Sequence, residues 1–220
     1  MKREIIETKD GSTTIFFPEL NETYHSKFGA IQEAQHVFIE MGFNQIQSHS
    51  ISILEMGFGT GLNAFMTFLE AKKSKKSVNY IGVEAFPVLH DEISQMNFVS
   101  QLNANSDQTI FDDLHRAAWN KAVSLSDYFT LTKREQFFQE IADTNQFNLI
   151  YFDAFGFRIE PELWSYDIFK KMHNALQING ILVTYACRSS IIKDLIAIGF
   201  KVEKLPGAPG KREMLRATKV

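Results

Sequence analysis

Four carboxylate side chains follow short apolar runs along the chain. Glu55, Glu84 and Asp153 each end such a run, and Glu135 comes shortly after a fourth. If these runs are parallel strands of one sheet, their carboxyl ends meet at a single edge, and so do the four acids. One acid at a strand end is ordinary turn chemistry, whereas four on one rim favour a ligand that is cationic and rich in hydroxyl groups.

The first of these acids leads directly into a glycine-rich loop. Residues 51–63 read Ile-Ser-Ile-Leu-Glu-Met-Gly-Phe-Gly-Thr-Gly-Leu-Asn, with Gly57, Gly59 and Gly61 at alternate positions. A helical pattern over 62–73 follows. Because glycines let a ligand approach the backbone, the N–H groups and the positive end of a helix could face one ligand here. The stretch predicts a nucleoside-binding loop between a buried strand and a helix.

Two nucleoside cofactors fit this loop by pattern, and charge distinguishes them. Residues 59–64 match the G-x-G-x-x-A pattern of dinucleotide-binding proteins, so an NAD oxidoreductase is one alternative. The Glu55 carboxylate would oppose a pyrophosphate near the loop, whereas it would attract a sulfonium ligand that carries an ammonium group. Glu84, at the end of the next strand, could accept hydrogen bonds from both ribose hydroxyls. These residues favour S-adenosyl-L-methionine over NAD.

Apolar runs alternate with helical patterns through most of the chain. The alternation predicts an α/β fold with a mainly parallel sheet and helices on both faces. Seven strands are expected, and the last two form a C-terminal antiparallel β-hairpin. The expected strands cover 51–55, 78–83, 128–132, 147–152, 180–185, 200–205 and 212–218, and the expected helices cover 62–73, 87–102, 111–122, 134–142, 161–176 and 189–198.

The segment before this sheet has its own elements. A hairpin is expected over 4–17, because Asp10-Gly11 is a strong two-residue turn signal between apolar runs. A helix is expected over 30–41, where apolar residues form one stripe. We expect residues 1–49 to be an extension that covers the site, and residues 50–220 to form the main domain.

Charge and composition argue against several classes of protein. The net charge of −3 does not suit a general nucleic-acid binder, yet residues 188–220 carry eight Lys or Arg against three acids. This local excess fits either a solvated sheet edge or a polyanion contact. With one cysteine, no apolar signal segment and no run of roughly 18 apolar residues, the chain is expected to be soluble, cytoplasmic and without a membrane segment. The six histidines lack the spacing of metal ligands, so no metal is expected.

Several motifs resemble one family over nearly the whole chain. Residues 55–63 are similar to motif I of class I S-adenosyl-L-methionine-dependent methyltransferases, and the particular residues in this motif resemble those of the MnmC-type tRNA methyltransferases. Segments that match this family in order are 24–26, 33–38, 80–87, 152–155, 161–164, 180–185 and 210–215. The resemblance implies the Rossmann-like class I fold and methylation of the amine of 5-aminomethyl-2-thiouridine at the tRNA wobble position. The product would be 5-methylaminomethyl-2-thiouridine.

The resemblance also implies roles for individual residues. Asp153 would hydrogen-bond the amine and accept or relay its proton, and Phe155 could stack on the uracil ring. Lys211 and Arg212 would contact phosphates of the anticodon stem-loop. The alternatives are a loop cap for Asp153, core packing for Phe155 and plain solvation for the basic pair. Glu33 and Tyr185 are also expected at the substrate, and the expected cofactor-binding residues are Glu55, Gly57, Gly59, Gly61, Asn63, Glu84, Ala85 and Glu135.

The chain departs from the family pattern in two places. Bifunctional members carry a second, flavin-dependent oxidase domain, which a chain ending at Val220 is expected not to have. The usual Gly-Asp after the third strand is replaced by Arg134-Glu135, and we expect the adenine contact at Glu135. Two other hypotheses remain, namely a methyltransferase that acts on a small amine or a protein, and a catalytically silent RNA-binding module. The sequence does not specify the oligomeric state.

Overall fold

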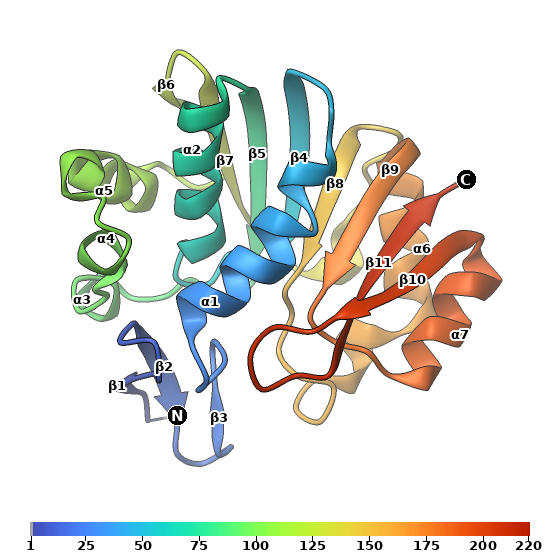
Figure 1. Ribbon diagram of the computed structural model, residues 1–220, viewed down its shortest axis with the longest axis horizontal. Coiled ribbons are helices and arrows are strands. Elements are labelled where there is room, and N and C mark those ends of the chain that lie inside the picture. The colour runs from blue at the N-terminus through green and yellow to red at the C-terminus, as the bar shows by residue number, and fades with distance from the viewer. Residues whose placement is uncertain (1) are drawn as a thin grey trace.

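A single eight-stranded sheet forms the centre of the computed structural model, which describes residues 2–220. Its strand order is β10-β11-β9-β8-β4-β5-β7-β6, as Figure 1 shows from the right of the molecule to the left. Neighbouring strands run parallel from β9 through β7, and β11 pairs antiparallel with both β9 and β10. The bounds are β4 (Ser50–Met56), β5 (Ser77–Glu84), β6 (Ala122–Ser126), β7 (Phe129–Glu135), β8 (Phe147–Phe152), β9 (Leu176–Thr184), β10 (Phe200–Pro206) and β11 (Glu213–Lys219).

Helices cover both faces of this sheet. Alternate residues of the central strands point to opposite faces of the sheet and belong to two separate hydrophobic cores. Ile53 packs on one face and Leu54 on the other. The first core contains Phe65 of α2, and the second contains Phe169 of α6. The α-helices are α1 (Ala30–Ala34), α2 (Leu62–Ser74), α3 (His90–Ile93), α4 (Phe98–Gln101), α5 (Gln108–Arg116), α6 (Tyr166–Ala175) and α7 (Ser189–Ile198). The predicted fold class, including the C-terminal antiparallel strands, is confirmed.

The sheet has one strand more than the sequence analysis predicted. The additional strand, β6, forms an antiparallel hairpin with β7 at the edge of the sheet. Strand β7 is also longer than expected, because it pairs with β5 as far as Glu135 opposite Glu84. The helix predicted over 134–142 was therefore wrong, and only a 3₁₀ turn, Phe138–Glu140, forms there.

Three other predicted helices are interrupted. The helix expected over 87–102 is two short helices, α3 and α4, and the one over 161–176 is a 3₁₀ turn, Pro161–Trp164, followed by α6. The helix over 30–41 continues from α1 as a π-helical segment, Gln35–Glu40. Further 3₁₀ turns are Phe43–Gln45 and Asn105–Asp107. None of the helices in residues 2–220 combines the length and apolarity needed to cross a membrane.

The N-terminal segment forms a second, small sheet. The predicted hairpin is present as β1 (Glu4–Glu7) and β2 (Thr13–Phe17), and a short third strand, β3 (Glu22–Thr23), adds to it. Asp10 stabilises the hairpin turn, because its Oδ1 accepts the Ser12 backbone N–H at 3.0 Å. Figure 1 shows this small sheet beside the carboxyl ends of the parallel strands, where α1 leads the chain back toward β4.

Candidate active site

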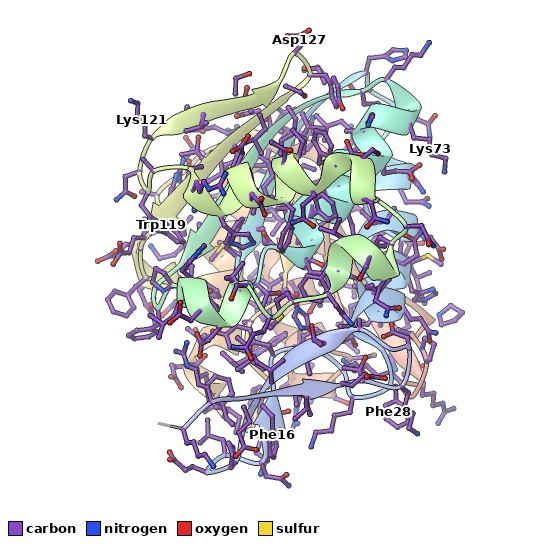
Figure 2. The ribbon with its side chains drawn as sticks, turned by 90° about the vertical axis from the view of Figure 1, so that its left-hand side faces the viewer. Phe16, Phe28, Lys73, Trp119, Lys121 and Asp127 are labelled. Carbon is purple, nitrogen blue, oxygen red and sulfur yellow. The ribbon has the colours of Figure 1, made fainter. Side chains whose placement is uncertain are left out.

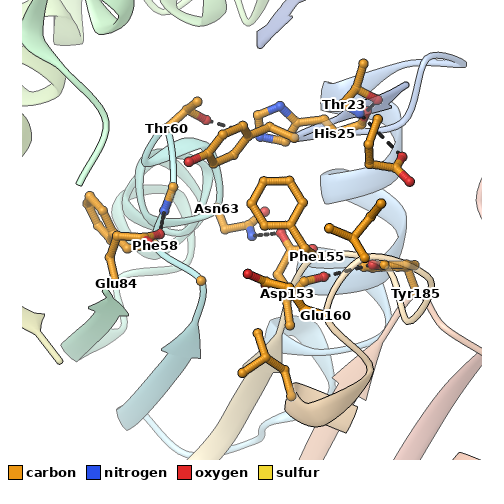
Figure 3. Close-up of a pocket in the computed structure, with 18 of the residues that line it drawn as sticks. Thr23, His25, Phe58, Thr60, Asn63, Glu84, Asp153, Phe155, Glu160 and Tyr185 are labelled. Atoms are coloured by element: carbon orange, nitrogen blue, oxygen red, sulfur yellow. Dashed lines mark hydrogen bonds between the residues drawn. The ribbon is translucent and has the colours of Figure 1, made fainter. Parts of the chain in front are cut away.

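A cavity of about 780 Å³ opens at the carboxyl ends of the parallel strands. Parallel sheets place their ligand sites at this edge. The loops after β4, β5 and β8 line one part of the cavity, and residues from β2 through α1 line another. Figure 3 shows how side chains from these distant segments converge on it. The cavity is large enough for a nucleoside ligand together with an acceptor.

The glycine loop presents backbone rather than side chains to this cavity. Gly57 has φ 95°, and a Cβ there would lie 2.5 Å from the carbonyl oxygen of Asp153. Gly59 has φ 49°, and a Cβ there would lie 3.1 Å from the ring of Tyr24. Both glycines line the cavity, whereas Gly61 lies at the start of α2 and outside the lining. Glycine is required because these conformations and close approaches disfavour any side chain.

Glu84 is fixed at the end of β5 by two backbone donors. Its Oε2 accepts the N–H of Gly59 at 3.0 Å, and its Oε1 accepts the N–H of Phe86 at 3.0 Å. Burial raises the pKa of Glu84, and the two N–H groups act against that rise. Each carboxylate oxygen has further acceptor capacity, and both Glu84 and Ala85 line the cavity. This geometry suits a carboxylate that accepts hydroxyl hydrogen bonds from a ligand.

Asp153 follows β8 directly and lies at the centre of the cavity wall (Figure 3). Asn63, in the first turn of α2, donates its Nδ2 to Asp153 Oδ2 at 2.9 Å. Within the described residues, Oδ1 accepts no hydrogen bond. Burial and the nearby Glu33 carboxylate raise the pKa of Asp153 to about 7, against the opposing effects of Asn63 and Lys211. A carboxyl group with this pKa can hold or accept a proton near neutral pH.

A second carboxylate and a lysine complete this part of the site. Glu33 of α1 is 8% exposed and forms an ion pair with Lys211, which comes from the turn between β10 and β11. The Lys211 Nζ also lies 3.7 Å from the ring centroid of Tyr185, whose hydroxyl donates to the Ala154 carbonyl at 2.8 Å. Two acids and one lysine therefore face the same space, which gives it a negative balance when both acids are ionised.

Aromatic side chains enclose the space in front of Asp153. The ring of Phe155 lies 4.9 Å from that of Tyr24 and 5.6 Å from that of Phe17, both in edge arrangements. Trp164 holds the Phe155 backbone by donating its indole N–H to the carbonyl at 2.7 Å. The stacking role expected for Phe155 stays a prediction, but the residue lines the cavity and also packs against the core.

The N-terminal segment supplies residues that sequence reasoning did not assign to the site. Tyr24 lies against Gly59, and burial raises its pKa. His25 bridges the two parts of the chain, because its Nδ1 pairs with the Thr14 hydroxyl at 3.0 Å and its Nε2 with the Thr60 hydroxyl at 3.1 Å. Burial lowers the pKa of His25 to about 4, so the ring is neutral at physiological pH. The only signal for these residues was the matching segment 24–26.

Besides Gly61, two residues expected to bind the cofactor do not line the cavity. Glu55 is 1% exposed and lies beneath the glycine loop, where burial raises its pKa well above the ordinary value. It does not line the cavity, and its expected contact with a ligand ammonium stays a prediction. Glu135 is exposed at the end of β7 and is also absent from the lining. Phe86 and Phe137, whose rings lie 5.8 Å apart, border the cavity on that side instead.

Several basic side chains of the C-terminal segment already have partners within the protein, which their composition alone did not indicate. Lys211 lines the cavity and pairs with Glu33, but its side chain is still 30% exposed, so its expected contact with a phosphate stays a prediction. Arg216 pairs with Glu203 on β10, and Lys219 is buried with its Nζ on the Leu176 carbonyl. Arg212 is exposed and forms no ion pair within residues 2–220. Within the same residues, no three His, Cys, Asp or Glu side chains are grouped as a metal site requires.

Comparisons with known proteins agree with this geometry. Residues 112–220 match the model of a family described as S-adenosyl-L-methionine-dependent methyltransferase. The bifunctional protein MnmC of Delftia acidovorans, named for tRNA 5-methylaminomethyl-2-thiouridine biosynthesis, is 28% identical over 223 residues, which cover 93% of this chain and 33% of that protein. MnmC of Leptospira interrogans is also 28% identical, over 90% of this chain and 32% of its own. The chain spans about a third of the length of these curated relatives.

Solved structures share the fold. The crystal structure of MnmC2 from Aquifex aeolicus superposes with a TM-score of 0.77 at 24% identity, over 99% of this chain and 70% of that one. DesVI from Streptomyces venezuelae superposes with a TM-score of 0.52 at 12% identity, over 86% of this chain and 92% of that one. The structural likeness supports the fold, and the family model adds that proteins matching residues 112–220 depend on S-adenosyl-L-methionine.

Proposed function

We propose that this chain, whose residues 112–220 match a family of S-adenosyl-L-methionine-dependent methyltransferases and which is a homologue of MnmC, methylates a primary amine on tRNA. The proposed acceptor is the aminomethyl group of 5-aminomethyl-2-thiouridine at the wobble position of the anticodon stem-loop. The product would be 5-methylaminomethyl-2-thiouridine, the nucleoside in the name of the curated relatives.

The observation that carries this proposal is the pair of acids, Asp153 and Glu33, in the cavity wall. Asp153 and Glu33 face a space that holds one lysine, so an amine or ammonium is the acceptor chemistry it favours. An oxygen or carbon acceptor would gain less from this negative balance. The enclosing aromatic rings fit the flat base to which the proposed amine is attached.

The residues present fit the cofactor. The side-chain-free backbone at Gly57 and Gly59 leaves a cradle that a Cβ would fill, and the Glu84 carboxylate can accept two ribose hydroxyls. Ala85 and Asn63 complete this side, and Phe86 with Phe137 would border the adenine in place of Glu135. When bound, S-adenosyl-L-methionine supplies an activated methyl group, so the protein has to position the acceptor and exclude water.

Asp153 would hold and orient the acceptor amine. Asn63 fixes Oδ2, which leaves Oδ1 to accept a hydrogen bond from the amine and to take up the proton that the amine loses. The raised pKa of Asp153, about 7, matches this exchange near neutral pH. Glu33 and Lys211 set the charge around it, and the N-terminal residues 1–49 would cover the site and keep water out.

Methyl transfer to tRNA tests this function. Bulk tRNA from cells that lack the gene would be incubated with the protein and S-adenosyl-L-methionine labelled in the methyl group, digested to nucleosides and separated. We expect label in 5-methylaminomethyl-2-thiouridine. Cofactor binding without labelled tRNA would contradict the proposed substrate, and label in another nucleoside would contradict the proposed position.

A further inference from the structure

Two surface loops meet beside the cavity at an exposed phenylalanine. Phe28, in the loop before α1, is 45% exposed, and its ring lies against Gly210, where a Cβ would come within 2.4 Å of it. Gly210 belongs to the turn between β10 and β11. The neighbouring residues Ser26, Ala30 and Lys211 line the cavity. Phe28 is therefore a rim residue, at the junction of the N-terminal and C-terminal segments.

Two lysines lie over aromatic rings of the N-terminal segment. The Lys9 Nζ lies 4.4 Å from the centroid of Phe28, and the Lys27 Nζ lies 4.6 Å from the centroid of Phe16. The two lysine loops are joined, because the Lys9 N–H donates to the Lys27 carbonyl at 3.1 Å. Arg212 follows Gly210 in the same turn. All three cations are exposed, and none forms an ion pair within residues 2–220.

The acids near this rim are already engaged. Asp10 accepts the backbone N–H groups of Ser12 and Gln32 at 3.0 Å each. Glu33 pairs with Lys211 inside the cavity, and Glu213 lies 3.5 Å from the Lys204 Nζ. Asp10 keeps its negative charge, so the three exposed cations outnumber the one of these three carboxylates that forms no ion pair within residues 2–220, and the rim is locally positive on a chain whose net charge is −3. We call Lys9, Lys27, Phe28 and Arg212 the rim patch.

We propose that the rim patch binds the single-stranded RNA next to the nucleotide that enters the cavity. The cations would contact phosphates on either side of that nucleotide, and Phe28 would stack on a neighbouring base. Stacking on an exposed aromatic ring and contacts from unpaired lysine or arginine are the two interactions that single strands use. This inference rests on the proposed function, and it adds the face on which the RNA lies and the residues that hold it.

Three sets of variants test the proposal. Lys9→Ala, Lys27→Ala and Arg212→Ala are combined in one protein, Phe28→Leu removes the aromatic face, and Phe28→Tyr retains it. Lys121→Ala is the matched control, since Lys121 is an exposed lysine at the opposite end of the molecule from Phe28 in Figure 2. Affinity for an anticodon stem-loop RNA is measured by fluorescence anisotropy over a range of salt concentrations, and S-adenosyl-L-methionine affinity is measured by calorimetry.

We expect the triple variant to bind the RNA more weakly and to lose about 0.7 in the slope of log affinity against log salt for each phosphate contact removed. Phe28→Leu should weaken binding roughly tenfold with an unchanged salt slope, while Phe28→Tyr and Lys121→Ala should bind as the wild type does. Cofactor affinity should be equal in all of them, because none of the changed residues lines the cavity.

The outcomes separate this inference from the proposed function. If the wild type methylates tRNA but the triple variant and Phe28→Leu keep its affinity and salt slope, the rim patch is not the RNA contact and the inference is wrong. If the wild type neither binds the RNA nor methylates tRNA, the proposed function itself is wrong, and the inference falls with it. Equal weakening by Lys121→Ala would also overturn it, since it would show general electrostatic attraction.

Discussion

Two walls of one cavity are built on different principles. The cofactor wall consists of Gly57, Gly59, Asn63, Glu84 and Ala85, and its one acid is held by backbone N–H groups of adjacent loops. The acceptor wall consists of Glu33, Asp153, Phe155, Tyr185 and Lys211, which come from α1, the segment after β8, the end of β9 and the turn before β11. Hydrogen bonds within neighbouring loops fix the acid of the cofactor wall, whereas charges from distant parts of the sequence set the pKa of the acid in the acceptor wall.

The difference separates binding from chemistry. Glu84 has a hydrogen-bond donor on each oxygen, so its position is fixed whether or not the acceptor wall is intact. Asp153 has a donor on Oδ2 alone, and its pKa depends on Glu33 and Lys211. Changes in one wall should therefore alter one step and spare the other, and each of the following changes tests that separation.

The largest effect is expected from Asp153→Asn. The amide has nearly the shape of the carboxyl group but cannot accept a proton, so methyl transfer at saturating cofactor should fall by roughly 10²–10⁴-fold. Cofactor affinity should stay within a few-fold of the wild type, because Asp153 belongs to the acceptor wall. Single-turnover transfer and calorimetric titration give the two quantities. Comparable losses in both would mean that Asp153 supports the cofactor or the fold.

Glu84→Ala should have the opposite pattern. It removes the acceptor proposed for two ribose hydroxyls, and hydrogen bonds to a charged group contribute about 1.5–3 kcal/mol. We expect cofactor affinity to fall about 10- to 100-fold, with transfer at saturating cofactor little changed. Glu135→Ala is the control on the neighbouring strand, because that acid is exposed and outside the cavity. Unchanged affinity in Glu84→Ala would remove this residue from the cofactor wall.

The smallest effect is expected where the N-terminal segment meets the glycine loop. Thr60→Val leaves the buried His25 Nε2 without its partner and should lower the free energy of unfolding by about 1–2 kcal/mol. Denaturant unfolding measures this, and full wild-type stability would show that the bridge is dispensable.

The pH dependence of stability has a definite sign at His25. Its pKa is about 4 in the folded protein and 6.5 as a reference, so the unfolded chain binds more protons between these values. Its contribution to stability is therefore present above pH 6.5 and is lost as the pH falls toward 4. Denaturant unfolding measured between these two pH values checks this loss, and stability that does not change over that range would contradict it.

The cofactor wall was largely predictable from sequence. The glycine loop after one strand and the acid at the end of the next strand are both patterns that can be read from short stretches of the chain. Glu55 shows the limit of that reasoning. Its position before the loop suggested a ligand contact, but the pleat of β4 turns the side chain into the interior. Glu135 shows a related limit, because β7 continues through this residue and leaves its side chain exposed, and its expected adenine contact stays a prediction.

The acceptor wall was only partly predictable. The place of Asp153 directly after a buried strand was enough to predict it as a site residue. The contact of Glu33 with Lys211 joins residues 178 positions apart, and it depends on how α1 packs across the sheet. The same holds for His25 and Thr60, which meet across the two sheets. Sequence pattern specifies which elements form, whereas these pairs depend on how distant elements pack.

The pH dependence of methyl transfer tests the central claim most directly. At saturating tRNA and cofactor, the wild-type rate should rise with pH to a plateau with a midpoint near 7, because the Asp153 carboxylate is the active form. Glu33→Gln removes a charge that raises this pKa, so its midpoint should move to lower pH. Lys211→Met removes a charge that lowers it, so its midpoint should move to higher pH. One midpoint shared by all three proteins would contradict an acceptor wall tuned by Glu33 and Lys211.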